Sequence, residues 1–298
     1  MPSTPTDPPV AAHPADAPLL RGLLDDAAVF PPAAVPLPDA VRLHRGHRAS
    51  SWAAAVGPLL VPASGVADLV AVLERDAERS PGDDRLDVVL VARPGAEPAV
   101  VTAGLDALAD EARARVVGAE LAWHEGWRDL GLDDLAVAVE VPRGEDHERA
   151  LTDVAAAARG GARVVVKLRT GPTTTWPWPD EAEVAGFLVR TAALGVPFKL
   201  TGGLHHAVRG TYDVAGVAEE NHGVLNVFLA TSAAVSEAGR DEVTALLGLR
   251  DAGALADLVA AWPDATAALV RRSFTAYGCC TVTDPLGELA ALGLVDTP

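Results

Sequence analysis

The chain has 298 residues, of which 49% are hydrophobic and 22% charged, a composition typical of a globular protein with a large core. Its formal net charge of −17 argues against nucleic acid or an anionic membrane as a partner, because both bind basic surfaces. It contains no run of about 18 apolar residues and no basic segment followed by an apolar one. We therefore expect neither a membrane span nor a secretory signal.

The apolar pattern along the chain predicts repeated β/α units. Residues 1–18 are rich in proline, alanine and aspartate, which predicts a flexible tail. From residue 19 to residue 250, short apolar runs alternate with helical stretches rich in alanine, leucine, glutamate and arginine, as in a parallel sheet with crossover helices. Strands are expected at 23–30, 58–63, 86–93, 115–123, 135–143, 163–171, 196–203 and 223–231.

Eight strands in such a pattern predict one α/β domain, a closed (β/α)8 TIM barrel over residues 19–250. Residues 251–298 are expected to form a C-terminal helical extension packed on the barrel. An open doubly wound sheet is the alternative fold. It would usually carry a glycine-rich phosphate turn after its first strand, and the sequence has none there.

Two lysines dominate the predicted site. Lys167 and Lys199 are the only lysines in the chain, and they occupy the same place in adjacent predicted strands. An arginine stays protonated, whereas a buried amine beside a second cation can lose its proton. The sequence therefore predicts that one of the two amines keeps the other neutral and nucleophilic, as Schiff-base chemistry requires. A cluster of lysine–glutamate salt bridges at the barrel mouth is the structural alternative.

Other charged residues are expected near these amines. Glu120 and Glu140 interrupt apolar strands and are candidate proton shuttles. Arg169 shares a strand face with Lys167 and is a candidate clamp for a substrate carboxylate. Of Asp25 and Asp26, which end the first strand, one should face the barrel mouth, and Asp26 is included among the substrate-binding candidates.

Two motifs resemble those of a known family. KLRTG at 167–171 and FKLTGGL at 198–204 resemble the strand-six K-T-S-T-G and strand-seven F-K-P-A-G-G-V motifs of the deoxyribose-phosphate aldolase family, class I aldolases on a (β/α)8 barrel. The resemblance covers the stretch from Arg163 to His206. It implies that Lys167 forms the Schiff base, that Lys199 lowers its pKa, and that Gly202 and Gly203 let substrate approach the backbone.

The sequence also departs from that family. Arg169 replaces a small polar residue, and no phosphate cradle follows the predicted eighth strand, so the substrate is expected to be a small carbonyl compound bearing a carboxylate or a phosphate. Thr201, which shares a face with Lys199, is a further substrate-binding candidate. The segments LLDDAAVFPPA, GLHH, NHGVLN and SFTAYGCC are also similar to a bacterial barrel family of unassigned function, a similarity that implies no chemistry.

Histidines support a second hypothesis, a metal-dependent lyase or hydrolase. His205, His206 and His222 could bind a divalent ion together with a glutamate. Neither an HxH nor an HExxH spacing occurs, so we expect no metal and no other cofactor. The three histidines are instead assigned to substrate binding, and Asn226 on the predicted eighth strand is assigned to a substrate hydroxyl.

A third hypothesis is a non-catalytic barrel that binds a small acidic metabolite through Lys167, Lys199 and Arg169. A homo-oligomer is compatible with the sequence, which leaves the oligomeric state open.

The segment after the sixth strand, Trp176-Pro177-Trp178-Pro179, is expected either to cover the site or to pack on its own helix. Cys279 and Cys280 are adjacent, which disfavours a disulfide and predicts a reducing, cytoplasmic location. They are expected to lie away from the site.

Overall fold

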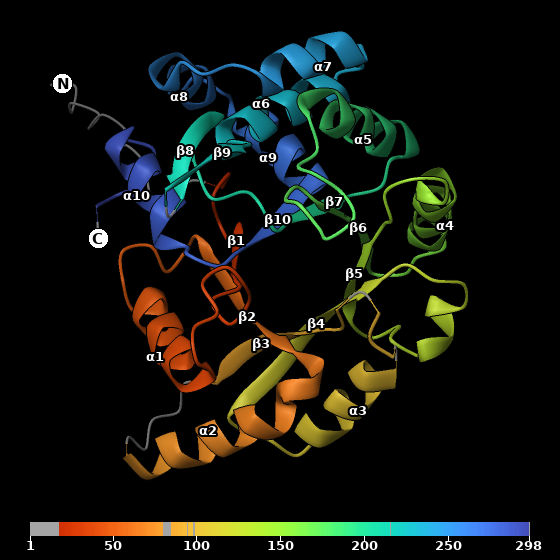
Figure 1. Cartoon of the computed structure of the whole chain (residues 1–298), viewed down its shortest axis with the longest axis vertical. Helices are drawn as coiled ribbons and strands as arrows, with labels where there is room; N and C mark the ends of the chain where they lie inside the picture. The colour runs from red at the N-terminus through yellow and green to blue at the C-terminus, as the bar shows by residue number, and fades with distance from the viewer. Residues whose placement is uncertain (1–17, 80–84, 94, 98, 215, 298) are drawn as a thin grey trace, which may run out of the picture.

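The fold is a closed barrel of parallel strands surrounded by helices. A computed structural model describes residues 18–79, 85–93, 95–97, 99–214 and 216–297. Within these ranges the strands close in the order β1-β10-β7-β6-β5-β4-β3-β2, and Figure 1 shows the resulting ring. The predicted (β/α)8 barrel is therefore confirmed. The tail expected at 1–18 lies outside the described residues except for Pro18.

The first seven predicted strands are present near their expected positions. Most of them are apolar runs rich in valine and leucine, which suit a parallel sheet covered on its outer face by helices. The strands are β1 (Leu24–Asp26), β2 (Val56–Pro62), β3 (Leu86–Val91), β4 (Ala114–Ala122), β5 (Ala136–Glu140), β6 (Val164–Arg169) and β7 (Phe198–Thr201).

Helices separate most of these strands and cover the outside of the barrel (Figure 1). The helix α5 shows why they form where they do. Its first turn is capped by Asp180, whose side chain accepts a hydrogen bond from the Glu183 N–H, and it ends at Gly195 in a left-handed conformation. The crossover helices are α1 (Leu37–Arg48), α2 (Val66–Arg79), α3 (Ala99–Leu108), α4 (His147–Arg159) and α5 (Glu181–Leu194).

The eighth strand was predicted at the wrong place. Residues 224–231 belong to the helix α6 (Val224–Val235), and the strand that closes the barrel is β10 (Phe274–Cys279). Nearly every residue of α6 is buried, so its sequence is continuously apolar and lacks the polar face that would mark a helix. β10 was missed because its short apolar run directly follows the helical pattern of α9 (Asp264–Ser273) and contains Gly278.

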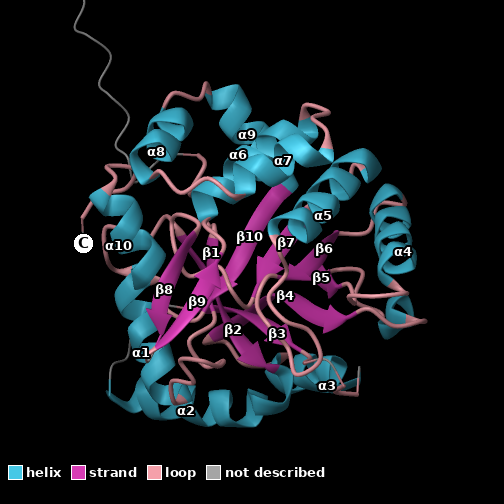
Figure 2. Cartoon of the chain, turned by 45° about the horizontal axis from the view of Figure 1, so that its top comes forward, coloured by secondary structure: helices cyan, strands magenta, loops and turns pink. Residues whose placement is uncertain are grey.

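The connection from β7 to β10 is accordingly long. It holds the antiparallel hairpin of β8 (Gly210–Val214) and β9 (Val217–Asn221), and then α6, α7 (Arg240–Leu247), α8 (Ala252–Ala260) and α9. The expected division at residue 250 is therefore wrong, because residues 251–298 supply both a barrel strand and the final helix α10 (Thr283–Ala291). Figure 2 shows the hairpin beside α10.

Within the described ranges, no single helix is both long and apolar enough to cross a membrane. The pair α8 and α9, bent by 109°, reaches that length and composition only when the two are taken together.

Glycines allow the segments after β6 and β7 to pack against each other. A Cβ at Gly171 would overlap the carbonyl oxygen of Gly202, and a Cβ at Gly203 would lie 2.6 Å from the nitrogen of Gly171. Gly202 has a φ of 71°, which a side chain rarely adopts. The glycines of the two motifs therefore bring two backbones into contact at the carboxyl end of the barrel.

Gly171→Ala is expected to destabilise the protein by about 3 kcal/mol, because the obstructing atom is backbone and the two loops must move apart. Gly46→Ala is the matched control. Gly46 lies inside α1 with no atom within 4 Å of an added Cβ, so alanine there should stabilise by about 0.5–1 kcal/mol. Denaturant unfolding of both variants measures the difference. Equal stabilities would contradict the loop packing.

Candidate active site at the carboxyl end of the barrel

A cavity of about 330 Å³ lies at the carboxyl ends of the barrel strands. This is the end at which TIM barrels carry their chemistry. Its walls combine charged side chains with an apolar face. The lining consists of Ala27, Phe30, Pro31, Leu60, Val91, Ala92, Arg93, Glu120, Glu140, Lys167, Arg169, Thr201, Gly202, His205, Gly278 and Cys280.

Lys167 is held between two carboxylates. Its Nζ donates a hydrogen bond to Oε2 of Glu120 at 2.7 Å and lies 2.9 Å from Oε2 of Glu140. The other oxygen of Glu140 accepts a hydrogen bond from Nε of Arg169 at 3.2 Å. β6 pairs with β5 so that Lys167 lies directly opposite Glu140, which explains their contact. The predicted proton shuttles and the predicted clamp therefore converge on the predicted nucleophile.

Lys199 lies beside Lys167 but contacts different groups. The two residues are register partners on β6 and β7. Nζ of Lys199 donates to Asp25 and to Oε1 of Glu120, so one carboxylate bridges the two amines. Neither Lys199 nor Asp25 lines the cavity, whereas Lys167 and Glu120 do. The two lysines are thus not equivalent, because only Lys167 faces the space that a ligand could occupy.

The charges of this network stabilise one another. Burial alone would raise the pKa of Glu120, but attraction to Lys167 and Lys199 outweighs it and lowers that pKa to about 2. Burial alone would lower the pKa of Lys167, but Glu120 and Glu140 outweigh it and raise that pKa above its usual value. The pKa of Lys199 is likewise raised, by Asp25 and Glu120 against the effect of burial.

The expectation that Lys199 makes Lys167 neutral is therefore wrong for this resting state. Glu120 lies between the two amines and attracts both protons more strongly than the ammonium groups repel each other. Asp25 differs from the other carboxylates of the network. Burial raises the pKa of Asp25, and Lys199 offsets this effect only in part. The salt-bridge cluster considered from the sequence is what the resting site contains.

Of the remaining predicted substrate-binding residues, Thr201, Gly202 and His205 line the cavity. Gly203 does not, and an added Cβ there would meet the backbone of Thr170 and Gly171. Gly202 leaves space for Arg169, since its Cβ would lie 2.5 Å from a guanidinium nitrogen of that residue. The role expected for Gly203, close approach of substrate to backbone, is thus corrected to loop packing, whereas Gly202 lines the cavity and its expected role stays a prediction.

Asp26 faces away from the cavity, which corrects its assignment to substrate binding. Its Oδ2 lies 3.1 Å from Nδ1 of His44 in α1, and its Oδ1 accepts the backbone N–H of Ala28. Successive side chains of a strand point to opposite faces, so Asp25 enters the barrel and Asp26 reaches the helix layer.

Three more predicted residues lie outside the cavity. His206 stacks on Tyr212 and lies 2.7 Å from Oε1 of Glu288, and Nε2 of His222 lies 2.8 Å from the carbonyl oxygen of Pro179. Asn226 belongs to α6, where it accepts the Arg209 N–H and donates to two carbonyl oxygens. Their assignment to substrate binding is wrong, because Asn226 was placed on a strand that does not exist and both histidines turn into the surrounding structure.

These positions also leave the metal hypothesis without a ligand set. The three histidines contact different partners, and the part of the chain that the structure describes contains no group of three or more His, Cys, Asp or Glu side chains arranged to hold a metal ion. Trp176 does not line the cavity. Its ring lies under the guanidinium of Arg143 at 5.2 Å, so it packs on the loop after β5.

Sequence reasoning missed Arg93, Phe30 and Cys280. Arg93 follows β3 and lies over the Phe30 ring at 5.1 Å, and both line the cavity. Arg93 is the first charged residue after an apolar strand, a signal that could have identified it. Cys280 follows β10 and also lines the cavity, so the expectation that the cysteines lie away from the site is wrong for this residue. It was missed because the eighth strand was misplaced.

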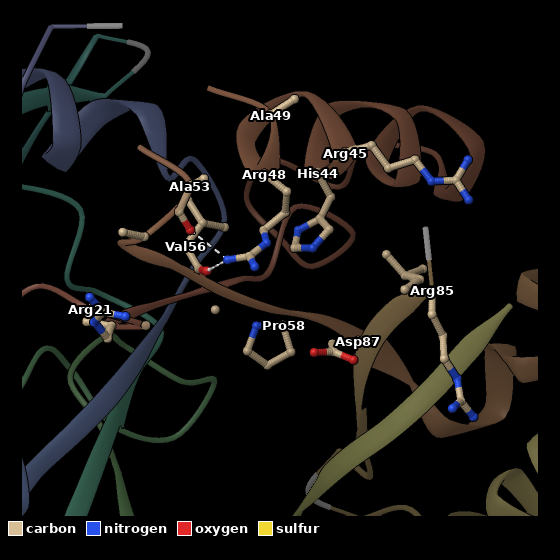
Figure 3. Close-up of a pocket in the computed structure, with 14 residues that line it drawn as sticks. Arg21, His44, Arg45, Arg48, Ala49, Ala53, Val56, Pro58, Arg85 and Asp87 are labelled. Carbon is tan, nitrogen blue, oxygen red and sulfur yellow. Dashed lines mark hydrogen bonds between the residues drawn. The ribbon is translucent and has the colours of Figure 1, made fainter. Parts of the chain in front are cut away.

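A larger cavity, of about 610 Å³, lies at the opposite end of the barrel, by the starts of β2 and β3 and the end of α1. Figure 3 shows that the guanidinium groups of Arg21, Arg45 and Arg85 spread to separate sides and do not converge. Arg48 donates to the carbonyl oxygens of Ala53 and Val56. Arg45 pairs with Asp76, and Arg85 donates to the carbonyl oxygen of Ala114. Of these two cavities, both lined by residues that the structure describes, only the one at the carboxyl end of the barrel has charged side chains that converge.

Comparison with known proteins adds no relative to this picture: no family model, no curated protein and no solved structure matches the chain.

Proposed function

We propose that the protein is a barrel enzyme of the class I aldolase type, a carbon–carbon lyase in which Lys167 forms a Schiff base with a small anionic carbonyl compound. The observation that carries the proposal is the position of Lys167. It is the only lysine that lines the cavity, and its Nζ contacts two carboxylates that can take and return its proton. The resemblance of the KLRTG and FKLTGG motifs to the deoxyribose-phosphate aldolase family supports the same role.

A proton transfer must precede attack, because the resting amine is an ammonium. Glu140 is the better acceptor, since Glu120 is shared by two ammonium groups and holds a pKa of about 2. The free amine then attacks the carbonyl carbon and gives a carbinolamine. Glu140 returns the proton to the departing hydroxyl, water leaves, and an iminium ion remains beside Glu120.

The charges around the cavity favour a substrate with a negative charge. Arg93 and Arg169 both line it, and Nε of Arg169 donates a hydrogen bond to Glu140. A guanidinium has five N–H donors, so Arg169 can bind a carboxylate or phosphate while it keeps this bond. In and directly beneath the cavity, four cations face three carboxylates: Arg93, Lys167, Arg169 and Lys199 against Asp25, Glu120 and Glu140.

Borohydride reduction in the presence of small 2-oxo acids and aldehydes tests the proposal. A stable adduct is expected on the peptide that contains Lys167, detected by mass spectrometry. Because the pKa of Lys167 is raised, the neutral fraction of its amine should grow by about tenfold per pH unit below that pKa. Trapping is therefore expected to be faster at pH 9 than at pH 7.

The absence of any adduct across the pH range and the carbonyl series would contradict the proposal. Reduced glutathione and a lysine peptide, treated in parallel, control for reduction of the carbonyl reagent before it reacts.

A second function is favoured by one observation, the protonated state of both amines. A barrel that binds a small acidic metabolite without turnover needs fixed cations, and Lys167, Arg169 and Arg93 provide them. This alternative predicts a rise in melting temperature with acidic metabolites such as 2-oxo and 2-hydroxy acids alike. The lyase predicts in addition that only the carbonyl compounds are trapped by borohydride.

A further inference from the structure

A cysteine and a histidine face each other across the cavity rim. Sγ of Cys280 lies 3.7 Å from Nδ1 of His205. Cys280 follows β10 and His205 follows β7, and these two strands are neighbours in the barrel. A thiol beside an imidazole nitrogen can lose its proton to that nitrogen and become a thiolate, the reactive form of cysteine.

Access distinguishes Cys280 from its neighbour in the chain. Cys279 also approaches Nδ1 of His205, at 3.9 Å, but it is fully buried and does not line the cavity. Cys280 retains 7% exposure and forms part of the cavity wall, as does His205. A small molecule in the cavity therefore meets only one of the two thiols.

The surroundings favour the thiolate at Cys280. Burial alone would raise the pKa of the Cys280 thiol, but the contact with His205 outweighs it and lowers that pKa below its usual value. Burial alone would lower the pKa of His205, but Cys280, Asp284 and Glu219 outweigh it and raise that pKa. Burial raises the pKa of Cys279 far above the usual range, so the inner thiol stays protonated.

We propose that Cys280, with His205 as its proton acceptor, is a second nucleophile of this cavity and takes α,β-unsaturated carbonyl compounds by conjugate addition. The other walls fit this class of electrophile. Leu60 and Phe30 offer an apolar face to a short hydrocarbon, and the charged N–H groups of Lys167, Arg93 and Arg169 can polarise a carbonyl oxygen. The proposal does not rest on Schiff-base formation at Lys167.

The reaction conserves atoms and charge. The thiol proton passes to Nδ1 of His205, and Sγ forms a bond to the β-carbon of the electrophile. The electron pair of the carbon–carbon double bond moves toward the carbonyl oxygen and gives an enolate. The enolate takes the proton back from the imidazolium at its α-carbon, so the product is a thioether that retains its carbonyl group.

Methyl vinyl ketone is the probe for the full-length protein, with iodoacetamide as a second electrophile and peptide mapping as the readout. The adduct is expected on Cys280 at pH 7 at a rate above that of glutathione, because contact with His205 lowers the pKa of this thiol. His205→Gln is expected to slow alkylation about tenfold and to shift the midpoint of its pH–rate profile upward.

Two variants make the result decisive. Cys279→Ser is expected to react as the wild type does, and Cys280→Ser is expected to lose the fast phase. Iodoacetamide cannot form an imine with a lysine, so its adduct on Cys280 separates this proposal from the Schiff-base proposal. Preferential labelling of Cys279, a rate no higher than that of glutathione, or a wild-type pH–rate profile in His205→Gln would each overturn the inference. If His205→Gln fails to fold, the pH–rate profile of alkylation measured on the wild-type protein replaces it. A midpoint no lower than that of glutathione in this profile would also overturn the inference.

Discussion

Lys167→Arg is expected to abolish reductive trapping of carbonyl compounds on lysine side chains, whereas Lys199→Arg is expected to retain it. Arginine keeps a positive charge beside Glu120 and Glu140 but cannot form an imine under these conditions. The chain has only two lysines, so Lys199→Arg leaves Lys167 as its single side-chain amine. An adduct on that variant, located on Lys167 by peptide mapping after borohydride and so distinguished from the α-amino group, therefore identifies the nucleophile directly.

The comparison needs folded proteins, because both lysines are buried and contact two carboxylates each. Circular dichroism and thermal melting of both variants provide that control. Persistence of a side-chain adduct in Lys167→Arg would move the nucleophile to Lys199. Loss of the adduct in a folded Lys199→Arg would show that the bridged pair acts as a unit through Glu120.

The position of the two lysines could be predicted because each lies within a short apolar strand with a fixed alternation of faces. Alternation placed Lys167 and Lys199 inside the barrel, and their equal position in adjacent strands placed them side by side, as their register confirms. The same rule could not separate Asp25 from Asp26, because the strand β1 is only three residues long and its start was not known to one residue.

The electrostatic state of the lysines could not be predicted in this way. Glu120 lies on β4, which is not a neighbour of β6 or β7, and it reaches both amines across the interior of the barrel. Asp25 reaches Lys199 from β1, two strands away from β7. Strand pairing indicates neighbours around the wall, whereas these contacts depend on the width of the barrel and on side-chain length.

The misplaced eighth strand had a larger consequence for the site than for the fold. The barrel still closes with eight strands, since β10 takes the position expected for residues 223–231. The exchange removed Asn226 from the interior and brought Cys280 to the cavity. A continuous apolar run is compatible with a buried strand and with a buried helix, and its periodicity alone does not distinguish them. The predicted strand covered residues 223–231, whereas the helix α6 runs from Val224 to Val235.

Glu120→Gln is expected to destabilise the protein by ~3 to 5 kcal/mol at pH 7, because it removes the charge that two buried ammonium groups share. Glutamine keeps the size of the side chain, so packing changes little. The matched control is Glu148→Gln. Glu148 pairs with Arg190 on the surface, where the side chains are 58% and 41% exposed, and the loss there should stay below about 1 kcal/mol. Urea unfolding of both variants measures the contrast.

The pH dependence of that contrast tests its cause. The folded protein holds the pKa of Glu120 at about 2, below the ordinary value of 4.5 that applies in the unfolded chain. The carboxylate therefore contributes stability above about pH 4.5, and this contribution of ~3 kcal/mol is lost as the pH falls toward 2. The stability difference between wild type and Glu120→Gln should shrink over the same interval. A difference that stays constant from pH 7 to pH 3 would show that the loss comes from packing and not from the shared charge.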